Sequence, residues 1–138
     1  MSQSVDEGRG RTWLRWGLAA VYALVGAVHL TAPDAMMPLM PGWVPEPRLV
    51  ILGTGLCELA GAVGILIPAS RRAAAIGLAL YAVCVYPANL KHAIDGIHID
   101  GIPDSWWYHG PRLAFQPVFV WAALWAGGLI YWPFRRRT

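Results

Sequence analysis

Charged side chains are scarce in this sequence. Only 14% of the 138 residues are charged and 57% are hydrophobic, whereas an ordinary soluble domain is about 25% charged. This composition excludes an ordinary soluble domain and indicates a membrane protein of a single domain. The net charge of +3 comes from cations at the ends of apolar segments. No basic stripe is interleaved with aromatic residues, so we expect no nucleic-acid partner.

Cysteine is also sparse, and familiar motifs of catalysis and electron transfer are missing. Cys57 and Cys84 both lie inside apolar runs, so the disulfide framework of a secreted domain is excluded. We interpret them as reduced thiols packed between helices, with a redox pair as the alternative. The sequence contains no C-x-x-C, nucleophile elbow, phosphate loop or dinucleotide fingerprint, and no motif for haem, an iron–sulfur cluster or flavin.

Long apolar runs are what the sequence does have. About 20 apolar residues cover the hydrocarbon core of a bilayer, and the runs predict transmembrane helices over residues 12–30, 49–67, 73–92 and 112–134. Pro87 is expected to kink the third helix. The first run also resembles a signal peptide, but no cleavage site leads into a polar mature domain. The predicted fold is all-α, an integral membrane four-helix bundle over residues 12–134. A disordered N-terminus over 1–11 precedes it, and a basic tail over 135–138 follows.

Arginine orients the predicted bundle. In a four-span arrangement three arginine clusters fall on the same side: Arg9, Arg11 and Arg15; Arg71 and Arg72; and Arg135–Arg137. The two long loops on the other side carry few cations. Since cytoplasmic loops are enriched in Lys and Arg, both termini are predicted to be cytoplasmic.

Small residues recur on the second predicted helix at the spacing that lets helix backbones approach closely. The residues are Gly53, Cys57, Gly61 and Gly64, and Gly17 and Gly26 are candidates for the same role on the first helix. We interpret them as packing signals.

A single acid, Glu58, lies within the second apolar run. A charge inside hydrocarbon costs at least about 2.5 kcal/mol, so it persists mainly where it faces partners. Polar residues of the other helices fall toward the same outer end of the bundle, including Tyr22 on the first helix and Tyr81 on the third. The predicted polar network or ligand site comprises His29, Thr54, Glu58, Asn89, His92, Arg112 and Gln116. Arg112 is expected to neutralise Glu58.

Three interpretations of this set stay open. The residues can form a structural network that fixes helix register, or the network can also bind a small ligand. A third interpretation is a zinc or copper site at His29, Glu58 and His92, with His98 or His109 from a loop as a further ligand. No H-x-x-E-H spacing accompanies it.

Several short motifs resemble those of the DoxX-like family of small bacterial four-helix membrane proteins, over nearly the whole chain. The matching stretches are His29-x-x-x-Pro33, Pro45-x-Pro47, Thr54-Gly55-x-x-Glu58-x-x-Gly61-x-x-Gly64, Arg71-Arg72-x-Ala74-Ala75, Pro87-Ala88-Asn89 and Arg112-x-x-x-Gln116. His92 stands where many relatives are expected to have methionine. The resemblance implies a multi-pass protein of the bacterial inner membrane. Some members of the wider family are similar to the small subunit of thiosulfate:quinone oxidoreductase, and others to accessory or assembly proteins of redox enzymes.

The leading functional hypothesis is an accessory or assembly subunit for a redox partner, rather than a stand-alone enzyme. Its outer polar pocket would hold a quinone headgroup or another small ligand, with hydrogen bonds from Glu58 and Gln116. The alternative is a catalytic membrane subunit of a quinone-linked, thiosulfate:quinone-type oxidoreductase. A solute transporter ranks last because the inner half of the bundle is almost without polar residues. Besides the bilayer, a redox-enzyme partner and a homo-oligomer are the expected associations.

Overall fold

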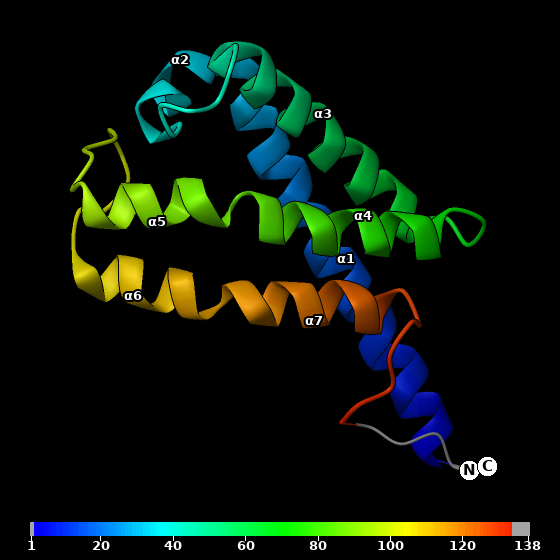
Figure 1. The fold of residues 1–138 in the computed structure, drawn as a ribbon. Helices are drawn as coiled ribbons and strands as arrows, with labels where there is room; N and C mark the ends of the chain where they lie inside the picture. The colour runs from blue at the N-terminus through cyan, green and yellow to red at the C-terminus, as the bar shows by residue number, and fades with distance from the viewer. Residues whose placement is uncertain (1, 134–138) are drawn as a thin grey trace.

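The computed structural model describes residues 2–133, and all regular secondary structure in this range is helical (Figure 1). The elements are α1 (Ser2–Thr31), α2 (Pro33–Met36), the 3-10 helix η1 (Met37–Leu39), α3 (Pro47–Leu66), α4 (Arg71–Cys84), α5 (Tyr86–Ile94), α6 (Trp106–Ala114) and α7 (Gln116–Ala126). The prediction of an all-α fold is confirmed. The predicted basic tail, residues 135–138, lies outside the described residues.

Three helical segments are long and apolar enough to cross a membrane. They are Gly8–Thr31 in α1, Pro47–Leu66, which is α3, and Arg71–Ile94, which combines α4 and α5. They correspond to the first three predicted spans. The interruption between α4 and α5 falls at Val85, next to Pro87. Proline lacks the N–H that would continue the helical ladder, so the helix is interrupted close to the position predicted for a kink.

The first helix begins earlier than predicted. α1 already includes the segment for which disorder was predicted, residues 1–11, from Ser2 onward, so that prediction is wrong for its described part. Arg11 gives one physical reason, because its guanidinium carbon lies 5.0 Å from the ring centroid of Trp125 and 4.7 Å from that of Tyr131. Such cation–π contacts stabilise the start of the helix against the C-terminal part of the chain.

The fourth apolar run forms two shorter helices, so the prediction of one continuous helix over 112–134 is wrong. It begins earlier, at Trp106, and it is interrupted at Phe115, between α6 and α7. Pro117 follows at the second position of α7 and cannot donate a backbone hydrogen bond. The pattern of apolar residues continues through this point, which is why periodicity alone predicted a single helix.

A glycine pair ends α7 at Ala126. Gly128 takes a left-handed φ of 74°, which glycine adopts without steric cost. The backbone N–H of Gly128 donates to the Trp125 carbonyl at 3.0 Å, and that of Leu129 donates to the Leu124 carbonyl at 2.9 Å. These two bonds form a Schellman motif, which satisfies the last carbonyls and stops the helix.

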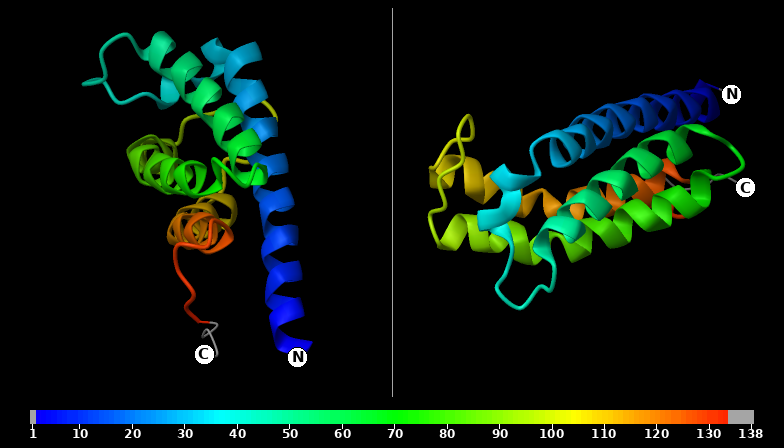
Figure 2. Two further views of the ribbon diagram at one scale, coloured as in Figure 1. Left: turned by 90° about the vertical axis from the view of Figure 1, so that its right-hand side faces the viewer. Right: turned by 90° about the horizontal axis from the view of Figure 1, so that it is seen from above.

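The helices are arranged so that α4 with α5 and α6 with α7 form two rows lying side by side (Figures 1 and 2). α1 packs along α3 and also contacts α7, while α3 contacts α4. The start of α1, the turn between α3 and α4 and the segment after α7 therefore lie at one end of the molecule. α2, η1 and residues 95–105 lie at the other end (Figure 1).

Glycines set the closest helix contacts. A Cβ atom on Gly26 would lie 2.9 Å from the Gly55 carbonyl oxygen, and one on Gly61 would lie 2.3 Å from a methyl carbon of Leu78. By contrast, a Cβ on Gly17 or on Gly53 would meet no atom within 4 Å. The packing role predicted for Gly26 and Gly61 is thus confirmed, and that for Gly17 and Gly53 is wrong.

Candidate functional site

Glu58 is buried and is bonded by two other helices. Its side chain is 2% exposed. One carboxylate oxygen lies 2.5 Å from Nδ1 of His29 on α1, and the Tyr81 hydroxyl of α4 donates to the other at 2.6 Å. The expectation that Glu58 is bonded across helices is met, and both of its oxygens have partners.

The close approach of α1 and α3 allows His29 to reach Glu58. Gly26 and Gly55 face each other there, and a Cβ on Gly55 would lie 2.9 Å from the Cβ of His29. Because neither glycine carries a side chain, the two backbones come close enough for an imidazole one turn further along α1 to meet the carboxylate.

Two neighbours complete the surroundings of Glu58. The Thr54 hydroxyl donates to the Ile51 carbonyl at 2.7 Å, so Thr54 shares the predicted face without bonding to the acid. The Tyr22 ring, 6% exposed, meets the Tyr81 ring edge-on at a centroid distance of 6.0 Å. The buried carboxylate thus lies beside a pair of aromatic rings, those of Tyr81 and Tyr22.

The remaining predicted residues form a second cluster between α5 and the α6–α7 row. Arg112 donates to Nδ1 of His92 at 2.9 Å and to the Asn89 side-chain oxygen at 3.1 Å. Asn89 in turn donates to the Gln116 side-chain oxygen at 3.3 Å. No described hydrogen bond or ion pair joins Arg112 to Glu58, so the prediction that Arg112 neutralises Glu58 is wrong. The proposed metal set of His29, Glu58 and His92 does not converge, since His92 belongs to this second cluster.

Gln116 has a structural task that follows from the kink in the α4–α5 row. Its amide nitrogen donates to the Ala82 carbonyl at 2.5 Å, and the side chain is buried. A carbonyl beside an interrupted helix has lost its regular partner, and a buried carbonyl needs another donor. Gln116 therefore satisfies the backbone at the break near Pro87.

His109 was placed in a loop by its sequence position, but it lies in α6 and is buried against His92, with ring centroids 4.7 Å apart. The sequence signal for the start of this helix is Ser105, because serine is favoured just before a helix begins. The structure begins α6 directly after it. Together with the apolar Trp106 and Trp107, Ser105 could have predicted a helix over this part of the loop.

In the segment that connects α5 to α6, His98 forms ion pairs within residues 95–105. Its Nδ1 lies 3.0 Å from Asp104 and its Nε2 lies 3.4 Å from Asp100. The hydrogen bond to Asp104 is the main cause that raises the pKa of His98 above its ordinary value. Because the folded protein binds this proton more tightly, the stabilisation is present at low pH and is lost as the pH rises through the raised pKa.

The two cysteines are free thiols, and both are exposed on the outside of the helices. Their predicted position between packed helices is therefore wrong. For Cys57 the reason is the direction of the packing face of α3, which runs through Gly55 and Glu58 rather than through Gly53 and Cys57.

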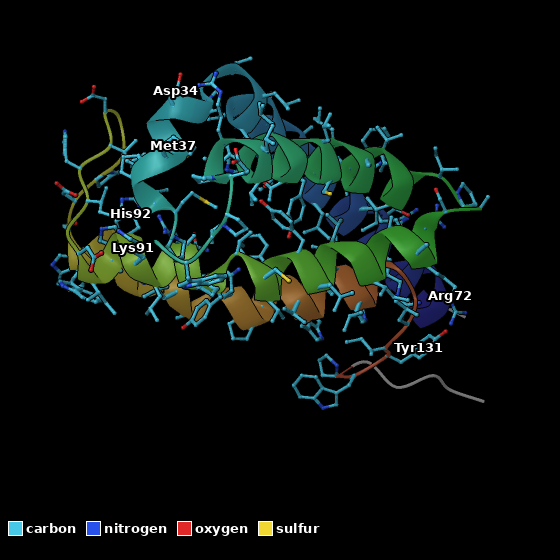
Figure 3. The ribbon with its side chains drawn as sticks, turned by 45° about the horizontal axis from the view of Figure 1, so that its top comes forward. Asp34, Met37, Arg72, Lys91, His92 and Tyr131 are labelled. Atoms are coloured by element: carbon cyan, nitrogen blue, oxygen red, sulfur yellow. The ribbon has the colours of Figure 1, made fainter. Side chains whose placement is uncertain are left out.

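Opposite ends of the molecule differ in chemistry. Figure 3 shows Met37, Lys91 and His92 at one end, and Arg72 and Tyr131 at the other. At the latter end Arg15 donates to the Ala126 carbonyl at 2.8 Å, and Arg71 donates to the Leu66 carbonyl at 3.1 Å. Arginines thus cap helix C-termini at one end, whereas the histidine-containing clusters lie toward the other.

Comparison with known proteins gives a family without an assigned activity. No curated protein and no solved structure matches the sequence. A family model described as "Domain of unknown function (DUF8561)" matches residues 18–127, a range that includes both polar clusters. The chain belongs to the DUF8561 family of domains of unknown function.

Proposed function

We propose that this chain is an integral protein of the bacterial inner membrane, a four-helix bundle of the DoxX-like type with both termini in the cytoplasm. The three membrane-length helices support this. The α6–α7 row lies beside α4–α5 and supplies the fourth member. The arginine-rich end supports the orientation, because cations near helix ends are retained on the cytoplasmic side.

Reporter fusions test the orientation. A periplasm-active reporter fused after Thr138 is expected to be silent, and one inserted near Pro41 or near Asp100 is expected to be active. Reporter activity in cells, normalised to expression of each fusion, is the measurement. The reverse pattern would place the histidine clusters on the cytoplasmic side and contradict the proposal.

We infer further that the protein is an accessory subunit for a redox partner and that the His29–Glu58 pair binds the headgroup of a quinone. The proposal of a bound quinone rests on the exposure and hydrogen bonding of His29. Its side chain is 18% exposed, Nδ1 is held by the buried Glu58, and within the described residues Nε2 has no hydrogen-bond partner. The accessory role rests on the DoxX-like resemblance.

The His29–Glu58 pair suits a quinone chemically. With Nδ1 donating to the carboxylate, Nε2 of neutral His29 is an acceptor for a quinol hydroxyl. When the ring is protonated, Nε2–H becomes a donor for a quinone carbonyl, and Glu58 offsets the charge. Quinones dissolve in hydrocarbon, so a partly exposed imidazole on a membrane helix is accessible to them.

Photolabelling tests the ligand. A short-tailed benzoquinone carrying a photoreactive group is expected to label α1 or α3 near His29 in the purified full-length protein, with protection by excess short-tailed ubiquinone. His29→Ala should lower labelling about tenfold, the equivalent of one hydrogen bond of about 1.4 kcal/mol. Peptide mass spectrometry locates and quantifies the label. The matched control is His98→Ala, an exposed histidine of the segment that connects α5 to α6. Equal labelling of the His29→Ala variant, or no protection by ubiquinone, would contradict the proposal.

A further inference from the structure

His109 is buried without a partner. The whole residue is 2% exposed, and neither ring nitrogen has a hydrogen bond within the part of the chain that the structure describes. Buried polar side chains are nearly always paired, and an exception calls for a group such as an ordered water or an ion. An imidazole enclosed in this way needs a partner that is not one of the described side chains.

Two further side chains converge on His109 from different elements. His92 of α5 is 1% exposed, and Asp104 lies on the segment that connects α5 to α6. One potential ligand atom from each of the three residues lies within 4.8 Å of the other two. Two imidazoles and a carboxylate therefore meet where α5, α6 and their connection come together.

The surroundings hold these groups in place. His92 is oriented by Arg112, and the rings of Trp106 and Tyr108 lie against His109 at centroid distances of 6.3 and 5.3 Å. His98 bonds one carboxylate oxygen of Asp104 at 3.0 Å, which leaves the other oxygen for a ligand. Partners of this kind orient metal-binding carboxylates in known sites.

We propose that His92, Asp104 and His109 form a binding site for a divalent transition-metal ion of the zinc type. Imidazole and carboxylate are ligands that Zn²⁺ accepts, and three protein ligands leave a fourth position for solvent or another molecule. Bonds of about 2.0–2.2 Å bring tetrahedral ligands about 3.4 Å apart. The ligand atoms, which lie within 4.8 Å of one another, therefore have to approach by up to about 1.4 Å on binding. The exposed Asp104 side chain supplies part of this movement.

Arg112 modifies the site. A guanidinium only donates, so Nδ1 of His92 accepts from it and the ring proton of the metal-free protein is on Nε2. Binding of the ion through Nε2 therefore moves that proton to Nδ1, which can then no longer accept from Arg112, and binding through Nδ1 displaces Arg112 directly. Arg112 keeps its two bonds to the carbonyl and side-chain oxygens of Asn89 in either case. The positive charge of Arg112 also opposes the ion, so binding is expected to be weaker than in a site without this neighbour.

The site is distinct from the His29–Glu58 pair and does not depend on the proposed quinone. Glu58 is bonded on both oxygens by His29 and Tyr81, and no residue is shared between the two sites. Variants of His29 are therefore expected to leave metal binding unchanged.

Metal titration of the full chain tests the site. The protein is purified in detergent through a tag without histidine, stripped with a chelator and titrated with Zn²⁺ against a chromogenic chelator. We expect one Zn²⁺ per chain, and a Co²⁺ complex with visible absorption bands of a low-coordinate site. Asp104→Asn should weaken Zn²⁺ binding about tenfold or more. His109→Gln should abolish the Co²⁺ bands.

Matched controls separate the site from surface binding. Asp100→Asn removes the other, fully exposed carboxylate next to His98 and should leave the affinity unchanged, as should His29→Ala. If His109→Gln does not fold by circular dichroism, the comparison of Asp104→Asn with Asp100→Asn decides the question. Absence of stoichiometric binding, which would leave an ordered water as the partner of His109, overturns the proposal. Equal weakening by the Asp100 and Asp104 variants also overturns it.

Discussion

Gly55→Ala is expected to destabilise the protein, whereas Gly53→Ala, two residues away on the same helix, is expected to be neutral or stabilising. A methyl group on Gly55 would lie 2.9 Å from the Cβ of His29 and 3.0 Å from the backbone oxygen of Gly26. Backbone cannot move aside locally, so α1 and α3 must separate at a cost of about 1–3 kcal/mol. A methyl group on Gly53 meets no atom and improves helix propensity by up to about 1 kcal/mol.

Thermal unfolding in detergent measures both glycine variants, since the two proteins differ only in where one methyl group is placed. Gly26→Ala and Gly17→Ala repeat the comparison on α1, because only Gly26 faces α3 closely. Gly55→Leu should enlarge the effect and break the bond between His29 and Glu58. Equal melting temperatures for the Gly55→Ala and Gly53→Ala proteins would show that α1 and α3 do not touch at Gly55.

Glu58→Ala is expected to produce the largest loss of stability among single side-chain changes in the described core. It leaves Nδ1 of His29 and the hydroxyl of Tyr81 without their buried acceptor. Removing one partner of a buried charged network typically costs about 3–5 kcal/mol. The melting temperature in detergent, and the amount of protein recovered from the membrane, should both fall.

Glu58→Gln separates structure from ligand binding. Glutamine keeps an acceptor for Tyr81 and offers its amide N–H to His29, whose ring can exchange tautomers, so most of the stability should remain. If the pair binds a quinone, this variant should still fold while losing labelling, because a neutral amide no longer offsets a protonated His29. Unchanged stability of the Glu58→Ala protein would contradict the network itself.

Helix positions were largely predictable from sequence because long apolar runs bounded by proline-rich or charged stretches indicate long helices. The break between α4 and α5 was also predictable from Pro87, because a missing backbone N–H interrupts the helix close to the proline itself. The fourth run shows where this reasoning stops. Residues 127–133 are as apolar as the helix before them, but Gly127 and Gly128 allow the Schellman turn that ends α7. A hydropathy pattern contains no information about the backbone conformations that glycine permits.

The sequence predicted which polar residues belong to the candidate site, but it did not predict which of them bond to each other. Of the predicted polar residues on other helices, His29 is the one that bonds Glu58, because both lie on faces that the short Gly26–Gly55 contact brings together. Arg112 was assigned to Glu58 on charge alone, yet it pairs with Asn89 and His92 on the neighbouring row. Rotation of α3 about its axis decides this pairing, and rotation depends on tertiary contacts that a single sequence does not contain.

The chain order also determines when each partner of Glu58 becomes available during synthesis. α1 leaves the ribosome before α3, and α4 follows α3. In a bilayer, α3 would therefore emerge from the translocon when His29 is already available and Tyr81 is not. The Gly26–Gly55 contact would then let α1 and α3 enter the lipid together as a hairpin, with the acid shielded from hydrocarbon. Binding of α4 through Tyr81 completes the hydrogen bonding of Glu58 afterwards.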